Sequence, residues 1–162
     1  MIELRLFADY HQIHVFDEGS RTDLGDAWTE QATTDQVAVA RDSVGVGTTV
    51  NVNVQVTVEV LQAPPVDDNA HFDHVVEASF HSSSGRVVVM GCTDYEPDAE
   101  RFAVRPGWLR LRASRSNLLN AFRADVDSDE DPKTTEKVRL QIWPAEHDDL
   151  VVVRRWSADN VL

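Results

Sequence analysis

The sequence predicts an all-β fold, an antiparallel β-sandwich of about ten strands with at most one or two short helical turns. The segment TTVNVNVQVTVEV (48–60) places a valine at every even position from Val50 to Val60. Segments rich in β-branched and aromatic residues recur along the chain, and turn residues separate them every eight to twelve positions or so, roughly the sandwich spacing. No internal repeat or long helical pattern interrupts them. A closed barrel is the alternative architecture.

Two strands are predicted at the start of the chain, IELRLFA (2–8) and QIHVFD (12–17), with a short turn between them. After a turn-rich loop, Asp26 is the expected N-cap of a short helix whose first turn contains Glu30. This helix must end early, because β-branched residues and glycines fill the segment 36–49 that follows.

The alternating segment 48–60 is predicted to be a strand with one buried face. Side chains of a strand point alternately to its two faces, so the six even-numbered valines share one face and the polar residues share the other. A helix would distribute these valines around its whole circumference. The run is longer than a usual strand of about five or six residues, so we expect a bend or bulge within it.

The second half of the chain is predicted to supply the remaining strands. In chain order these elements are a hairpin at 71–92 with a serine-rich turn, a hairpin at 101–114 around Pro106 and Gly107, an acidic loop, and two strands at 136–146 and 150–156. The continuous apolar run 87–90 is typical of a central strand.

A length of 162 residues indicates one domain, residues 1–162, whose core needs no metal or disulfide to fold. Cys92 is the single cysteine, which excludes an internal disulfide and is typical of a reducing compartment. The N-terminus lacks the apolar core of a signal peptide, and no run approaches the roughly 20 apolar residues of a membrane span. We therefore expect a cytoplasmic protein without a membrane span.

The net charge of −13 is unevenly distributed. Residues 1–100 contain 18 acidic side chains against 4 arginines, a balance of −14, whereas residues 101–162 contain 10 acidic and 11 basic side chains, a balance of +1. Such a chain repels phosphates, so direct binding of nucleic acid is not expected. It attracts basic proteins, among them proteins that handle nucleic acid. Solubility alone, or adaptation to salt, explains the same composition.

Two histidine pairs have the spacing H-x-x-H, His11 with His14 and His71 with His74. On a strand this spacing sends the two imidazoles to opposite faces, so the first pair is not expected to share a metal. The second pair, together with Asp73, lies where a loop enters a strand. A metal-dependent enzyme built on these residues is one alternative, although a zinc site needs three or four ligands.

Residues 125–136 partly match a calcium-binding loop. Asp125, Asp127 and Asp129 occupy its first, third and fifth positions, and Glu136 occupies the twelfth. The sixth position, which requires glycine, is Glu130, so the favoured interpretation is a solvated acidic connection. No metal and no cofactor is expected.

No catalytic constellation is found. Cys92 and the serines 82–84 beside His81 would each need a base and an orienting acid, and neighbours on a strand face apart. The hydrolase elbow, the P-loop and the dinucleotide-binding motif are absent. We therefore expect no catalytic residue and no enzyme activity.

An exposed face of tryptophan and arginine is predicted on two late strands. Trp108, Arg110 and Arg112 share one side of the first strand, and Arg139 and Trp143 share one side of the second. If the strands pair, guanidinium groups stack on indole rings. Such a surface binds sugars, peptides or proteins, or its arginine stems simply cover the outer sheet.

Two patches of the sequence resemble the competence protein J family, small bacterial inhibitors of a DNA-entry nuclease. The first is ADYHQIHVFDEG (8–19) followed by DAWTEQATTDQVAVARDSVGVGT (26–48), and the second is RFAVRPGWLRLRAS (101–114) with LQIWPAE (140–146). The two patches lie within the spans 8–48 and 101–146, which make up about half of the chain. The order of the patches supports the resemblance more strongly than any single motif. The chain is longer than typical members, with extra length in the acidic loops near Tyr95 and Asp129.

This resemblance implies a catalytically silent protein that binds a nuclease and blocks it. A nuclease that grips DNA has a basic cleft, and acidic loops on a rigid β scaffold can fill it. The candidate contacts are Asp67, Asp68, Asp94, Glu96, Asp98, Asp125, Asp127, Asp129, Glu130 and Asp131, and the resemblance adds Tyr10, His11 and Trp28. The alternative is a sandwich that binds a carbohydrate or peptide through the Trp/Arg face.

Overall fold

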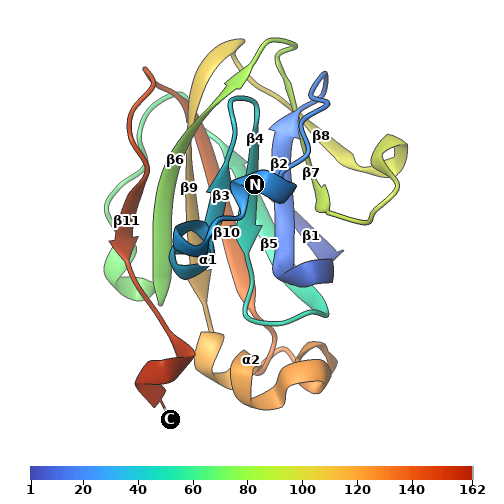
Figure 1. Cartoon of the computed structure of the whole chain (residues 1–162), viewed down its shortest axis with the longest axis vertical. Helices are drawn as coiled ribbons and strands as arrows, with labels where there is room; N and C mark the ends of the chain where they lie inside the picture. The colour runs from blue at the N-terminus through green and yellow to red at the C-terminus, as the bar shows by residue number, and fades with distance from the viewer. Residues whose placement is uncertain (162) are drawn as a thin grey trace.

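The computed structural model describes residues 1–161, and side chains as far as Asp159. Within these residues, eleven strands form two sheets that face each other across an apolar core (Figure 1). Sheet A contains, in spatial order, β1 (Ile2–Phe7), β5 (Asn53–Val60), β10 (Lys137–Pro144), β9 (Gly107–Ser116), β6 (His74–Ser82) and β11 (Val151–Arg154). Sheet B contains β3 (Val37–Val39), β4 (Ser43–Gly47), β2 (Gln12–Asp17), β7 (Arg86–Gly91) and β8 (Glu100–Ala103). The predicted sandwich, rather than a closed barrel, is therefore the architecture.

The helical elements are all short. They are the α-helices α1 (Glu30–Asp35) and α2 (Leu118–Ala124), and the 3₁₀ turns η1 (Asp9–His11), η2 (Gly25–Ala27), η3 (Asn69–His71), η4 (Glu96–Asp98), η5 (Asp125–Glu130) and η6 (Ala158–Val161). None of the helices in the described part of the chain has the length and apolar character to cross a membrane. We call the end of the sandwich that carries α2 the lower end, as Figure 1 draws it.

The valine-rich segment supplies the centre of the core, as predicted. Val54, Val56 and Val58 of β5 are at most 1% exposed and pack against the inward residues of both sheets. The expected bend is present, because the strand begins only at Asn53 and a bend precedes it. Val60 at the upper end of β5 remains 43% exposed, so the buried face does not extend along the whole valine-rich segment.

Sheet A is not purely antiparallel, and the prediction was wrong on this point. β10 pairs with β5 in parallel, with Val138 beside Val56 and Leu140 beside Val58. The reason is the path of the chain, which leaves β5 at the upper end and enters β10 from α2 and η5 at the lower end. Parallel neighbours need such a long crossover connection.

The helix α1 begins at Glu30, and its N-cap is Thr29 rather than the predicted Asp26, which lies in η2. The Thr29 hydroxyl accepts a hydrogen bond from the backbone N–H of Ala32 at 3.1 Å. We expect Thr29→Ala to lower the free energy of unfolding by about 1 kcal/mol in urea denaturation, because this N–H loses its partner. Asp26→Ala is the matched control, and an equal loss in that variant would contradict the assignment of the cap.

A buried ion pair ties the lower end of sheet A to the β4–β5 connection. Arg115 Nε lies 3.0 Å from Glu136 Oε2, and the two side chains are 1% and 0% exposed. Glu136 also accepts a hydrogen bond from the backbone N–H of Thr49 at 2.7 Å. The guanidinium donates further to Thr49 Oγ1 at 3.0 Å and to Gln36 Oε1 at 3.3 Å. Both charges are thus hydrogen-bonded as well as paired, which a buried pair requires.

Candidate partner-binding surface

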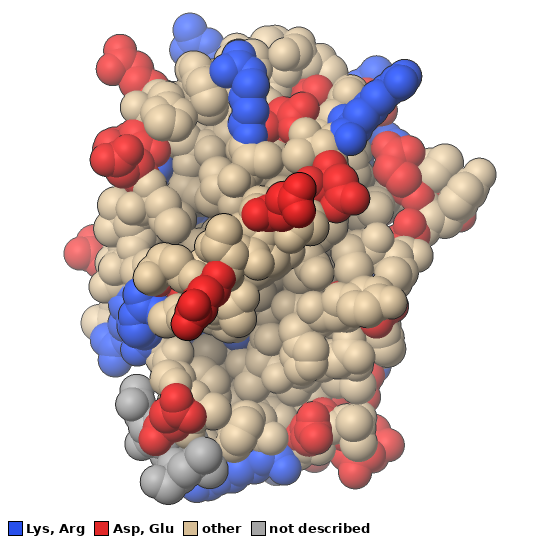
Figure 2. Space-filling model, in the orientation of Figure 1, with Lys and Arg blue, Asp and Glu red and all other residues tan. Residues whose placement is uncertain are grey.

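The ten acidic residues predicted to meet a partner lie in three separate loops. The first loop is the β5–β6 connection (67–68), the second is the β7–β8 loop (94–98), and the third is η5 with the residue after it (125–131). The β7–β8 loop projects beyond the sheets on the same side as β1 (Figure 1). Figure 2 shows Asp and Glu side chains along that margin and at the lower corner on the same side.

The first loop is engaged within the protein. Both carboxylate oxygens of Asp68 accept hydrogen bonds from the guanidinium of Arg139, at 2.7 and 2.8 Å. These bonds lower the pKa of the Asp68 carboxyl by more than its partial burial raises it. Asp68 therefore fastens the loop onto the outer face of sheet A, and Asp67 beside it remains exposed.

In the second loop, some carboxylates hold the backbone and others remain free. Asp94 accepts a hydrogen bond from the backbone N–H of Gly91 at 2.8 Å, and Glu96 pairs with Arg101 at 2.6 Å. Arg101 also pairs with Glu18 at 2.9 Å, which ties the loop to sheet B. Asp98 is exposed and takes part in no ion pair among the described residues.

In the third loop, Asp129 anchors the chain. Its carboxylate accepts hydrogen bonds from the backbone and side-chain amides of Asn53 at 3.1 and 2.9 Å, and Arg5 lies 3.7 Å away. The side-chain bond from Asn53 is the largest cause that lowers the pKa of the Asp129 carboxyl. The other acidic residues of this loop are exposed, and they are Asp125, Asp127, Glu130 and Asp131. Of these, Asp131 accepts a hydrogen bond from the backbone N–H of Lys133 at 2.8 Å.

The calcium template does not describe the third loop. Glu136, its twelfth position, is fully buried against Arg115 and is therefore unable to join the exposed aspartates. No group of three or more possible metal ligands occurs among the described residues. The solvated acidic connection is the better description.

The edge strand β1 connects the second and third loops. Within the described chain its one partner in sheet A is β5, and Arg5 reaches from it to η5. On the other side β7 passes so close that a Cβ atom on Gly91 would clash with the backbone oxygen of Phe7. Beyond β1, the carboxylate of Asp9 accepts a hydrogen bond from the Thr93 hydroxyl at 2.9 Å. These contacts place η1 beside the start of the β7–β8 loop.

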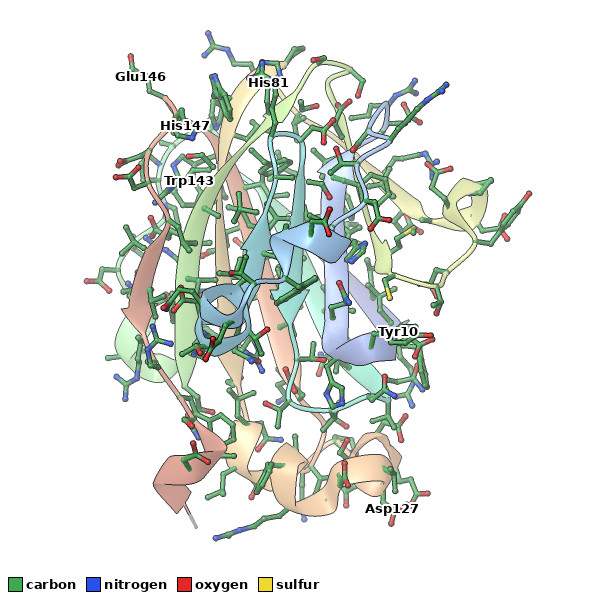
Figure 3. The ribbon with its side chains drawn as sticks, viewed as in Figure 1. Tyr10, His81, Asp127, Trp143, Glu146 and His147 are labelled. Atoms are coloured by element: carbon green, nitrogen blue, oxygen red, sulfur yellow. The ribbon has the colours of Figure 1, made fainter. Side chains whose placement is uncertain are left out.

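Tyr10 is presented to solvent by a strained turn. Tyr10 and His11 both adopt left-handed backbone conformations, with φ of 55° and 57°. Such conformations are costly for residues other than glycine, so they persist only where the surroundings impose them. Here Asp9 accepts a hydrogen bond from the Tyr10 N–H at 3.0 Å, and the N–H of Thr48 bonds the His11 oxygen at 2.9 Å. The Tyr10 side chain is 71% exposed, on the same side as Asp127 (Figure 3).

A cavity of about 270 Å³ opens between β1 and the β7–β8 loop. Its apolar lining comes from both sheets and the loop, and consists of Leu6, Val89, Met90, Ala99 and Tyr95. Its acidic lining consists of Asp94, Asp98 and Glu100, and no arginine or lysine lines it. We define the β1-edge surface as the exposed residues that line this cavity, Asp94, Tyr95, Asp98 and Glu100, together with the exposed Phe7 at the end of β1 and Tyr10 in the adjoining η1.

Phe7, Tyr95 and Glu100 of this surface were missed from the sequence. A local signal exists, because Tyr95 lies between Asp94 and Glu96 in a turn and is 71% exposed. The flanking carboxylates keep such a turn in water and its tyrosine exposed, and exposed tyrosines are common contact residues at interfaces.

The predicted Trp/Arg face pairs as expected, but the prediction that it is exposed was wrong. Trp143 lies opposite Arg110 in the β9–β10 pair, and the Arg112 guanidinium lies 5.7 Å from the Trp143 ring centroid. Yet Arg110, Arg112 and Trp143 are only 5%, 7% and 3% exposed.

Two loops cover this face. Arg112 donates to the Val66 carbonyl at 3.1 Å, and Arg110 donates to the carbonyls of Asp148 and Asp149 at 3.0 and 2.7 Å. Arg139 is held by Asp68, as described above. Trp108 keeps partial exposure at the upper end, where His81 and His147 contact its ring edge-on. Figure 3 shows both histidines at this end. The arginines thus attach loops to the sheet and leave no open ligand face.

Trp28 lies on the outer face of sheet B. Its indole N–H donates to Gln12 Oε1 at 2.9 Å, and His14 Nε2 lies 2.6 Å from the same oxygen. Gly45 permits this packing, because a Cβ there would lie 2.9 Å from the indole ring. Burial lowers the pKa of His14 by more than the charge of Asp23 raises it. Trp28 therefore lies apart from the β1 edge, in a polar network of its own.

The candidate nucleophiles serve local structure. The hydroxyls of Ser82 and Ser84 both donate to Asp17 Oδ1 at 2.6 Å and close the β6–β7 turn. Burial opposes ionisation of Asp17, but these hydrogen bonds lower its pKa overall. The Cys92 thiol donates to the Asp9 carbonyl at 3.3 Å, and burial raises its pKa, so it remains a thiol.

The second histidine pair is separated by burial. His74 is fully buried, and its two ring nitrogens are occupied by the Asp35 carbonyl at 2.9 Å and the Trp156 N–H at 3.1 Å. Asp73 accepts a hydrogen bond from the backbone N–H of Leu118 at 3.1 Å. His71 is exposed in η3 and has neither residue as a co-ligand.

No protein-family model and no curated protein matches this sequence. Solved structures do match its fold. ComJ from Bacillus subtilis, an inhibitor of the DNA-degrading activity of NucA, aligns with a TM-score of 0.67 at 14% identity, over 90% of this chain and 96% of ComJ. The product of crocagin biosynthetic gene J aligns with a TM-score of 0.57 at 17% identity, over the same shares of the two chains. The chain thus has the fold of ComJ, which confirms at the level of the fold the resemblance to the competence protein J family.

Proposed function

We propose that the protein is a non-catalytic inhibitor or immunity-type protein that binds a basic nuclease and blocks it. The observation that carries the proposal is the fold shared with ComJ over 90% of this chain, because ComJ inhibits a nuclease. The net charge of −13 supports it, since a protein that grips DNA offers positive charge to an acidic partner.

The β1-edge surface is the contact that we assign to the nuclease. Asp98 and Glu100 are exposed and take part in no ion pair in the described part of the chain. A lysine or arginine of the partner can therefore pair with them without breaking an ion pair within this protein. Tyr10 and Tyr95, each 71% exposed, add aromatic area of the kind that dominates binding energy at interfaces. Carboxylates steer the encounter, and the aromatic rings hold the complex.

The cavity beside β1 fits a lysine or arginine side chain of the nuclease. Its apolar lining, with Leu6 and Met90, accepts the aliphatic stem, and its acidic rim accepts the charged head. Removal of a DNA-contacting cation in this way blocks the nuclease without any chemical step.

The test is a DNA-degradation assay with a purified nuclease encoded beside the gene of this protein. We expect the wild-type chain to inhibit and the double variant Asp98→Lys/Glu100→Lys to inhibit at least about tenfold more weakly, most clearly at low salt. Asp67→Lys/Glu146→Lys is the matched control, because it makes the same charge change at exposed acids away from β1.

Two results would count against these assignments. An equal loss of inhibition in the control pair would remove the β1 edge as the contact and leave only a general effect of charge. No inhibition and no complex with the wild-type chain would overturn the inhibitor function itself. The ligand-binding alternative is not retained, because loops cover the Trp/Arg face on which it depends.

A further inference from the structure

We propose that the upper end of the sandwich holds a binding site for a small apolar carboxylate, separate from the β1-edge surface. A cavity of about 470 Å³ lies beyond the ends of β5 and β10, beside the β8–β9 turn. This volume is within the range of small-molecule sites, about 300–1,000 Å³. None of its lining residues belongs to the surface assigned to the nuclease.

The cavity is lined mainly by apolar side chains. Eight of its ten lining residues are apolar, namely Val60, Leu61, Ala103, Val104, Leu109, Ile142, Trp143 and Pro144. Leu109 and Ile142 are at most 1% exposed and continue the core, whereas Val60 is 43% exposed. By the alternation of β5, Val60 is on the same face as the buried Val58. Val60 is exposed because it lines the cavity instead of packing against other core residues. An apolar ligand body would complete the cover that Val60 lacks.

The two polar lining residues, Arg105 and Gln62, are both hydrogen-bond donors. In the described part of the chain, eight arginines pair with carboxylates and five have no ion pair and no hydrogen bond, and Arg105, which is exposed, is one of these five. No carboxylate lines the cavity either, so a cation beside an apolar hollow is left for an external anion.

The chemistry of the rim selects a carboxylate. A guanidinium group matches a carboxylate with two parallel hydrogen bonds, and the Gln62 amide supplies a further donor. A cationic ligand would meet Arg105 with repulsion, and a neutral apolar ligand would form no ion pair with it. A carboxylate with an aliphatic body fits both parts of the site, its chain in the cavity and its head at Arg105.

The test is isothermal titration calorimetry with octanoate, with octan-1-ol as the neutral probe of the same chain length. We expect octanoate to bind the wild-type chain, and Arg105→Gln to weaken it about tenfold while octan-1-ol is unaffected. Ala103→Trp fills the cavity from an exposed position on β8 and should abolish binding of both probes. Arg123→Gln, an exposed arginine on α2, is the matched control and should bind octanoate as the wild-type chain does.

Three outcomes would overturn the proposal. These are no octanoate binding to the wild-type chain at millimolar concentration, full binding to Ala103→Trp, and an equal loss in the Arg105 and Arg123 variants. Each is read directly from binding isotherms and is independent of nuclease inhibition, so this site and the proposed function stand or fall separately.

Discussion

Glu136→Gln is expected to lower the free energy of unfolding by about 3–5 kcal/mol, measured by urea denaturation. The substitution preserves shape and keeps an acceptor for the Thr49 N–H. It leaves the guanidinium of Arg115, which is 1% exposed, without a counter-charge in the interior. An uncompensated buried charge is among the few causes of so large a loss from one substitution.

Two controls identify the cause. Asp68→Asn removes a comparable pair with Arg139, but one that solvent reaches, and should cost no more than about 1 kcal/mol. The double variant Arg115→Met/Glu136→Leu removes both charges and should recover most of the loss, because no charge is left stranded. A double variant as unstable as Glu136→Gln would mean that packing, rather than charge, controls this site.

The free energy of unfolding is expected to fall by about 3 kcal/mol as the pH is lowered from about 7 to about 4, because of His74. Burial, and then the charge of Arg115, lower the pKa of His74 to about 4. The unfolded chain takes up a proton near the ordinary pKa, whereas the folded chain resists it. The contribution of His74 to the free energy of unfolding is therefore fully present above the ordinary histidine pKa. It is lost as the pH falls toward the pKa that His74 has in the folded chain. The Trp156 N–H, which donates to His74 Nδ1, opposes the added proton directly.

The measurement is a series of urea denaturations across this pH range for the wild-type chain and His74→Gln. The variant should lose most of the slope, although His14, whose pKa is also lowered, contributes in the same direction. The lowered pKa values of carboxyls such as Asp17 act mainly at the acidic end of this range and below it, because the unfolded chain takes up protons at these groups only as the pH approaches their ordinary pKa. An unchanged slope in the variant, or a His74 pKa near its ordinary value by NMR titration, would contradict the prediction.

Most of the fold follows from periodicity in the sequence. Alternation placed Val54, Val56 and Val58 on a buried face, and the same rule placed Arg110 and Trp143 on matching sides of two late strands that do pair. The parallel register of β5 and β10 does not follow, because strand patterning does not record at which end of a sheet the chain re-enters. The N-cap was misplaced because Asp26 and Thr29 are both good caps, and only the local backbone decides between them.

Less of the site was predictable. Exposure of Arg110 and Arg112 was predicted wrongly, because their strands alternate as surface strands do, while two distant loops happen to lie over them. Tyr10 and Asp98 were identified singly, but their common surface depends on an approach between β1 and the β7–β8 loop. The one sequence feature that reflects this approach is Gly91, because any side chain at that position would clash with the backbone oxygen of Phe7.

The parallel pairing of β10 with β5 also has a consequence during synthesis. β10 emerges from the ribosome about eighty residues after β5, so one edge of the valine-rich strand has no hydrogen-bonding partner during that interval. An unsatisfied apolar strand of this kind is a template for association between nascent chains. The first hundred residues carry a charge of −14, and we expect repulsion between growing chains to oppose such association until β10 pairs with β5.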